Sequence, residues 1–175
     1  MKKLLVLLPM ILLLAGCGSQ ETFETVTDNP MQQVSMVPEA QQVVLELPEN
    51  TKMQTMQNDG TGKLYFCDNF FITVQTVESG DLDGTLRSCT GFSQNQLRLI
   101  RTESQGAKCY ECVWASAGEG QEQVGRLCLL DDGNYHYVVT AMADAENAGA
   151  LQNTWQRLFD SVQLLPADLN LDTAS

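Results

Sequence analysis

The segment YHYVVTAMADAENAGALQNTWQRLFDSVQLL, residues 135–165, decides the fold, because a strand pattern in it runs directly into a helix pattern. In the first nine residues, Tyr135, Tyr137 and Val139 fall on one face of an extended chain. His136, Val138 and Thr140 fall on the other face, because side chains alternate along a strand. This alternation predicts a strand over residues 135–143.

The second half of the segment has helical periodicity. Asp144 is a good N-cap residue, and apolar side chains then recur every three or four positions. The members of this apolar stripe are Leu151, Trp155, Leu158, Phe159 and Val162. The stripe predicts an amphipathic helix that packs on a sheet.

Short alternating segments separated by turn residues predict further strands upstream. These strands are expected over residues 43–47, 63–67, 70–77, 96–102, 107–115 and 124–130. A weaker helical pattern covers residues 81–89, where Leu82, Leu86 and Cys89 share one side. Hairpin spacing favours antiparallel pairing, so we expect an α+β fold, an antiparallel β-sheet flanked by two or more helices.

The order of these elements resembles a known fold. A strand that ends in proline, VVLELP (43–48), opens the domain, hairpins follow, and YHYVVTAMA leads into a terminal helix ending FDSVQLL. This order resembles the PsbP-like α/β sandwich, which is shared by the photosystem II extrinsic protein, a eukaryotic nuclear-import factor and many bacterial lipoproteins. The resemblance covers residues 42–165 and implies binding of other proteins, with no shared catalytic residues. A cystatin-like or ferredoxin-like sandwich remains open.

The N-terminus has the pattern of an export signal. Lys2 and Lys3 precede an unbroken apolar run from Leu4 to Leu14, which ends in small residues. Eleven helical residues span roughly 16 Å, about half of the hydrocarbon thickness of a membrane. The run is therefore too short for a membrane-spanning helix, and we interpret residues 1–16 as a signal peptide.

The four residues Leu14, Ala15, Gly16 and Cys17 resemble the lipobox of bacterial lipoproteins. The resemblance implies that Cys17 is lipidated and that the signal peptide is cut just before it. Two or more acyl chains anchor a protein stably. We therefore expect residues 17–41 to be a lipidated N-terminus and flexible tether, and residues 166–175 to be a flexible tail. The protein is then expected on the extracytoplasmic face of the cell membrane or outer membrane.

Charge argues against nucleic acid as a partner. Without Lys2 and Lys3 the chain keeps eight basic residues against 22 acidic ones, a net charge of −14. Such a chain is repelled by phosphate backbones. The expected partners are the membrane, through the lipid on Cys17, and another envelope protein.

Five cysteines remain besides Cys17, and an exported chain can form disulfides. If facing residue numbers in the hairpin of residues 107–130 sum to 240, Cys112 lies opposite Cys128 and the two can bridge. Cys67 and Cys89 are a second candidate pair. The alternative is that all five are small buried apolar groups.

Other chemical motifs are weak. Cys109 and Cys112 form a C-x-x-C spacing, but within a strand they point to opposite faces. His136 is the only histidine, and a lone strand histidine is usually structural. The acidic stretch of Glu78, Asp81 and Asp83 lacks the spacing of a calcium loop, and capping explains it. We therefore predict no metal site, cofactor or catalytic residue.

Two functional classes follow from these observations. The first is a lipid-anchored binding or accessory module that engages another envelope protein or a surface ligand. The alternative is a thiol-dependent or metal-dependent envelope enzyme, which a reactive low-pKa thiol among Cys109, Cys112 and Cys128 would indicate.

Overall fold

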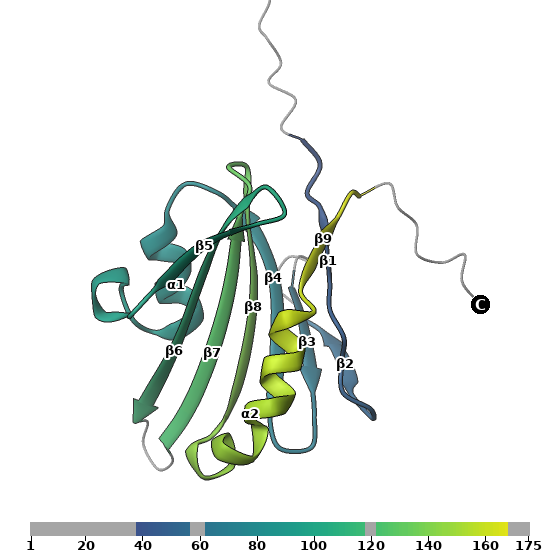
Figure 1. Cartoon of the computed structure of the whole chain (residues 1–175), viewed down its shortest axis with the longest axis vertical. Coiled ribbons are helices and arrows are strands. Elements are labelled where there is room, and N and C mark those ends of the chain that lie inside the picture. The colour runs from purple at the N-terminus through teal and green to yellow at the C-terminus, as the bar shows by residue number, and fades with distance from the viewer. Residues whose placement is uncertain (1–37, 57–61, 118–121, 168–175) are drawn as a thin grey trace, which may run out of the picture. The chain divides into compact units, whose positions relative to one another are not determined.

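A computed structural model of the protein describes residues 38–56, 62–117 and 122–167 (Figure 1). The predicted signal peptide, the lipobox and Cys17 lie outside these described residues. So do most of the predicted tether and of the predicted tail.

The described residues form two helices, one short 3-10 helix and nine strands. In chain order they are β1 (Gln42–Val44), β2 (Lys52–Thr55), β3 (Gly62–Phe66), β4 (Phe71–Glu78), α1 (Leu82–Thr90), the 3-10 helix η1 (Gln94–Gln96), β5 (Ile100–Ser104), β6 (Ala107–Ala117), β7 (Glu122–Asp131), β8 (Tyr135–Asp144), α2 (Ala145–Asp160) and β9 (Gln163–Leu165). Seven strands form one sheet in the order β2-β3-β4-β8-β7-β6-β5, and β1 pairs with β9 in a separate two-stranded sheet. Every pair is antiparallel, so the predicted α+β architecture is confirmed.

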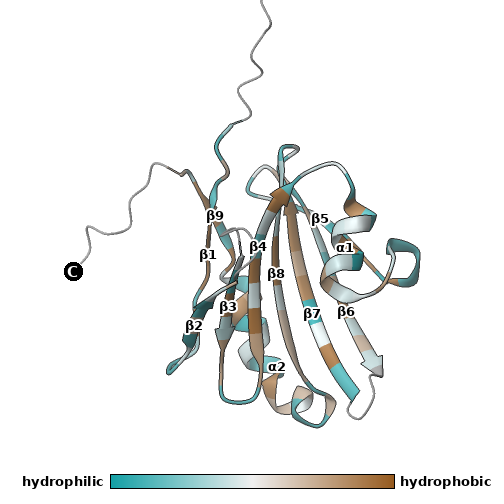
Figure 2. Ribbon diagram, turned by 180° about the vertical axis from the view of Figure 1, so that it is seen from behind, coloured by the Kyte–Doolittle hydropathy of each residue, from teal (hydrophilic) through white to brown (hydrophobic). Residues whose placement is uncertain are grey.

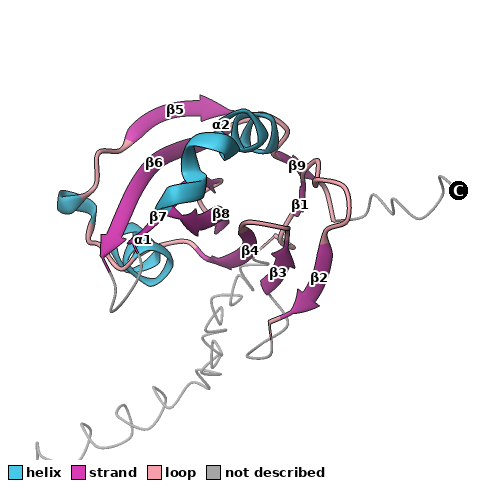
Figure 3. Ribbon diagram, turned by 90° about the horizontal axis from the view of Figure 1, so that it is seen from below, coloured by secondary structure: helices cyan, strands magenta, loops and turns pink. Residues whose placement is uncertain are grey.

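Helix α2 packs against one face of the main sheet, and the β1–β9 pair lies beside it (Figure 3). Tyr137 and Val139 of β8 are buried on this face, as the alternation predicted. Helix α2 contributes the buried side chains Leu151, Trp155, Leu158 and Phe159. Burial of this apolar stripe removes a large nonpolar area from water and fixes the helix on the sheet.

Helix α1 packs on the opposite face of the sheet. Its buried Leu86 joins Leu127, Leu129 and Val138 in a second apolar cluster, and Trp114 covers the cluster near the end of β6. Central strands are therefore apolar on both sides. In Figure 2 the strands β4, β7 and β8 carry brown, hydrophobic stretches, whereas the edge strand β2 is teal.

Most predicted elements are found within one or two residues. Helix α1 begins after Asp81, whose side chain accepts a hydrogen bond from the Gly84 amide, and ends at Gly91 in the left-handed conformation (φ 81°). Asp144 is the N-cap of α2 as predicted, although its side chain makes no capping hydrogen bond.

Two predicted strands differ from the structure. The strand expected over residues 96–102 starts only at Ile100, because Ser93 and Gln96 form a capping box that holds the preceding residues in η1. The strand expected over residues 43–47 is confined to β1 and belongs to the small sheet rather than the main one.

The domain begins slightly before residue 42. Ala40 packs against the apolar cluster between the sheet and α2. The backbone amide of Gln41 donates a 3.0 Å hydrogen bond to the Tyr137 hydroxyl. These last residues of the predicted tether are therefore bound to the domain.

Candidate functional site

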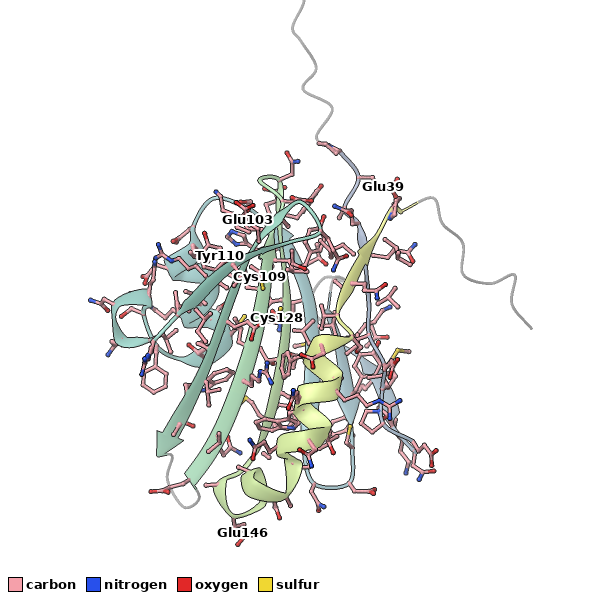
Figure 4. The ribbon with its side chains drawn as sticks, viewed as in Figure 1. Glu39, Glu103, Cys109, Tyr110, Cys128 and Glu146 are labelled. Carbon is pink, nitrogen blue, oxygen red and sulfur yellow. The ribbon has the colours of Figure 1, made fainter. Side chains whose placement is uncertain are left out.

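Two cysteines of neighbouring strands meet on the face of the sheet against which α2 packs. Cys109 of β6 and Cys128 of β7 place their sulfur atoms 3.8 Å apart (Figure 4). In the strand register Cys109 faces Leu130 and Cys128 faces Glu111, so the two cysteines are diagonal neighbours. Both are buried, with 4% and 5% of their surface exposed.

A charged pair lies next to the cysteines on the same sheet face. Arg126 donates a hydrogen bond of 3.1 Å from Nη2 to Oε2 of Glu111. The Arg126 guanidinium also lies over the Phe159 ring of α2, 4.6 Å from the ring centroid. Arg126 is thus held between the Phe159 ring and the Glu111 carboxylate, and a Glu111 oxygen lies within 4.8 Å of both sulfur atoms.

The hydrogen bond between Cys109 and Cys128 couples the pKa values of the two thiols. The hydrogen bond with Cys128, together with one to Thr102, lowers the pKa of Cys109 to about 7, against the opposing effects of burial and of the Glu111 charge. The hydrogen bond with Cys109 and burial raise the pKa of Cys128. Either sulfur can be the donor, so the pair loses its first proton more readily than its second. Burial raises the pKa of Cys112 to about 11.

The predicted disulfide pairs are not brought together. Facing residues of β6 and β7 have numbers that sum to 239, so Cys112 faces Leu127 and not Cys128. This slip of one residue turns Cys112 to the α1 side, while Cys128 lies on the α2 side. The register that we assumed was wrong.

The second predicted pair is separated in the same way. Cys67 packs on the α2 side of the sheet and Cys89 on the α1 side. All five cysteines of the described residues are free thiols. The expectation that Cys109 and Cys112 point to opposite faces is confirmed.

His136 is a structural residue, as expected. It is 2% exposed, with Nδ1 2.9 Å from Thr85 Oγ1 and Nε2 3.3 Å from Ser79 Oγ. Ser79 in turn donates to Asp131. Burial lowers the pKa of His136, although nearby aspartates oppose this effect. The imidazole therefore joins α1 to β8 in its neutral form.

The acidic stretch also has a local role. Asp81 caps α1, and Asp83 forms a 2.8 Å ion pair with Arg87. Asp83 also accepts a 2.6 Å hydrogen bond from the amide of Gln94. These contacts agree with the prediction that capping explains the acidic residues.

A second feature near the cysteine pair is a free sheet edge. Strand β5 pairs with β6 only up to Glu111, whereas β6 continues to Ala117. Within the described residues, the backbone of residues 112–117 pairs only with β7. Figure 1 shows this part of β6 running on past β5 at the margin of the sheet. We call residues 112–117 the free edge of β6.

A groove of about 420 Å³ lies beside this free edge. It is lined by Arg98, Ile100, Glu111, Cys112, Val113 and Arg126. Ile100 and Val113 are each 61% exposed, which is high for apolar side chains of a sheet. A larger depression of about 780 Å³ lies between β1 and α2, but it is lined mostly by polar groups.

Comparisons with known proteins give only distant structural similarities. No family model matches the sequence, and no curated protein is significantly similar to it. Among solved structures, LpqN of Mycobacterium tuberculosis, described as involved in cell envelope biogenesis, has a TM-score of 0.48 at 11% identity, over 73% of this chain and 85% of LpqN. The Ran-binding protein Mog1p of Saccharomyces cerevisiae has a TM-score of 0.47 at 12% identity, over 71% of this chain and 95% of Mog1p.

Cyanobacterial PsbP from Synechocystis is also among the similar structures. Its TM-score is 0.49 at 8% identity, over 71% of this chain and 92% of that protein. At such low identity these similarities concern the arrangement of helices and strands and do not extend to residues of the site.

Proposed function

We propose that this protein is a lipid-anchored binding module of the bacterial cell envelope, which binds an extended segment of another envelope protein along the free edge of β6. Membrane attachment is assigned to Cys17, in the lipobox-like sequence Leu14 to Cys17. Within the described part of the chain, no helix is long and apolar enough to cross a membrane.

The absence of protective charge along the free edge supports the binding site. An exposed edge strand is a template for pairing with another chain, and proteins usually protect it with charged residues or proline. The other edge strands of the sheet follow this rule, since β2 carries Lys52 and β5 carries Arg101 and Glu103. The free edge of β6 has the sequence CVWASA, which contains neither charge nor proline.

The side chains around the edge indicate what the partner presents. An added strand forms backbone hydrogen bonds, and pockets for alternate side chains give selectivity. Ile100 and Val113 offer apolar contact on the α2 side of the sheet. Arg98 lines the same groove, and a positive charge favours an acidic side chain nearby. The expected partner segment therefore combines apolar residues with at least one carboxylate.

Affinity capture from envelope membranes tests this proposal. The tagged protein is compared with Val113→Lys, which places a charge on the free edge, and with Met53→Lys as a matched control. Met53 is 59% exposed on the opposite edge strand, β2. We expect one envelope protein to be recovered with the wild type and with Met53→Lys and to be lost with Val113→Lys. Equal recovery by both variants would exclude the free edge as the binding site.

A further inference from the structure

We propose that Cys109, Cys128 and Glu111 form a binding site for a tetrahedral divalent metal ion, with Zn²⁺ as the best match. The two sulfur atoms and a Glu111 oxygen all lie within 4.8 Å of one another. They come from adjacent strands of a hydrogen-bonded sheet, so the backbone fixes their positions. This site adjoins the groove beside the free edge, but metal binding does not depend on the binding of a strand.

The spacing of the sulfur atoms suits a tetrahedral metal. Zn–S bonds are about 2.3 Å long, so two thiolates at a tetrahedral angle are about 3.8 Å apart. The Cys109 and Cys128 sulfur atoms are separated by 3.8 Å. A metal ion can therefore join them without movement of either strand.

A direct disulfide between the same residues is less well matched to the register. Cys109 and Cys128 are diagonal neighbours, because they face Leu130 and Glu111 respectively. Diagonal residues of antiparallel strands have Cα atoms about 7–8 Å apart. Disulfides usually need Cα atoms at most about 6.8 Å apart. A bridging metal spans the diagonal more easily than a sulfur–sulfur bond does.

The charges around the site also balance. A divalent ion, two thiolates and the Glu111 carboxylate have a net charge of −1, and the Arg126 guanidinium returns the group to neutrality. Arg126 already holds one carboxylate oxygen at 3.1 Å and is itself held against Phe159. Such outer partners orient metal ligands and are commonly needed for affinity.

The ligand types determine the metal class. Thiolates favour Zn²⁺ over Ca²⁺ or Mg²⁺, which prefer oxygen ligands. Three protein ligands leave a fourth position for water or for a donor atom of a bound molecule. Glu111 also lines the groove beside the free edge, so that position has a route to solvent.

Cobalt titration tests the site, because Co²⁺ replaces Zn²⁺ and gives an absorption band when bound by thiolates. The experiment uses the reduced full chain with Cys17→Ser, which removes the thiol outside the described residues. We expect one bound Co²⁺ with a thiolate charge-transfer band, displaced by one equivalent of Zn²⁺. Cys109→Ser and Cys128→Ser are expected to abolish the band. Cys112→Ser is the matched control, a buried cysteine of the same strand on the opposite face.

Glu111→Gln provides a test that does not alter the buried thiols. We expect it to keep the band but to weaken Zn²⁺ binding by roughly tenfold or more, as measured by competition with a chelator. The proposal is overturned if the reduced protein gives no thiolate band, if the band survives Cys109→Ser, or if Cys112→Ser abolishes it. Unchanged affinity in Glu111→Gln would remove the carboxylate from the site.

Discussion

Gly125 of β7 lies directly beneath the indole ring of Trp114, where a methyl group at Cα would collide with the ring. Both residues belong to the α1 side of the sheet, and Trp114 is 6% exposed. We expect Gly125→Ala to lower the free energy of unfolding by about 1–3 kcal/mol, because the packed ring must move. Denaturant unfolding followed by Trp fluorescence measures the change.

Gly149 of α2 is the matched control for this substitution. A Cβ atom there meets nothing within 4 Å. We expect Gly149→Ala to stabilise the protein by about 0.4–1 kcal/mol, because alanine restricts the unfolded chain and favours the helix. Equal effects of the two substitutions would contradict the close packing of Trp114 on β7.

His136 gives the protein an acid-sensitive contact. Burial lowers the pKa of His136 below its usual value of about 6.5. As pH falls through 6.5, the unfolded chain takes up the proton first, so stability is present above this pH and decreases below it. His136 is the single histidine of the chain, so its NMR signal is unambiguous. We expect a titration midpoint below 6.5, and a midpoint at or above 6.5 would contradict the burial of a neutral imidazole.

At the residue scale, the sequence predicts which side chains share a face but not which residues face each other across strands. Alternation separates Cys109 from Cys112 and Tyr137 from His136 without any knowledge of partners. The pairing of Cys109 with Cys128 depends on the register of β6 against β7, and a slip of one residue would separate the two side chains. Had the register been known, it would have placed Glu111 and Arg126 on the same face as diagonal neighbours and so indicated the charged pair as well.

At the scale of elements, α1 and α2 differ in how their N-termini are capped. The Asp81 side chain accepts a 2.9 Å hydrogen bond from the Gly84 amide, whereas the Asp144 side chain makes no capping bond to α2. We expect Asp81→Ala to lower the free energy of unfolding by about 1 kcal/mol and Asp144→Ala to have a smaller effect. Thermal unfolding of both variants measures the difference. A larger loss in Asp144→Ala would contradict the capping geometry.

The elements that were predicted correctly have strong periodicity. Helix α2 and strands β4, β6, β7 and β8 each bury one or both faces, so their apolar spacing is regular. Strand β2 has the sequence KMQT and is exposed throughout, so no pattern signals it. Strand β9 has only three residues. It is a strand because it pairs with β1, which lies more than a hundred positions earlier in the chain.

At the scale of the whole molecule, the class of fold follows from the order of elements, whereas the edges of the sheet do not. Strand β6 has eleven residues and β5 has only five, and this difference creates the free edge. Neither the length nor the pairing of β5 was evident, since Leu97 and Leu99 alternate with Arg98 and so predicted a strand that starts before Ile100. The site therefore became visible only when strand lengths were known.

The lipid anchor is a prediction about the molecule in its membrane. We expect Cys17→Ser to abolish incorporation of a fatty-acid label and to release the protein from the membrane fraction or to stall its processing. Metabolic labelling followed by membrane fractionation measures both effects. Cys112→Ser, which changes a buried thiol of the domain, is expected to leave labelling unchanged. Undiminished labelling of Cys17→Ser would contradict the anchor.

Photo-crosslinking in living cells tests the central claim most directly, because it reports what lies against the free edge of β6. A crosslinking amino acid replaces Val113, and in a second strain it replaces Met53, which is similarly exposed on the opposite edge. We predict that position 113 yields one dominant product with another envelope protein, that position 53 does not, and that Cys17→Ser removes the product. No product at position 113, the same product at both positions, or a product formed only between two copies of this chain would contradict the claim.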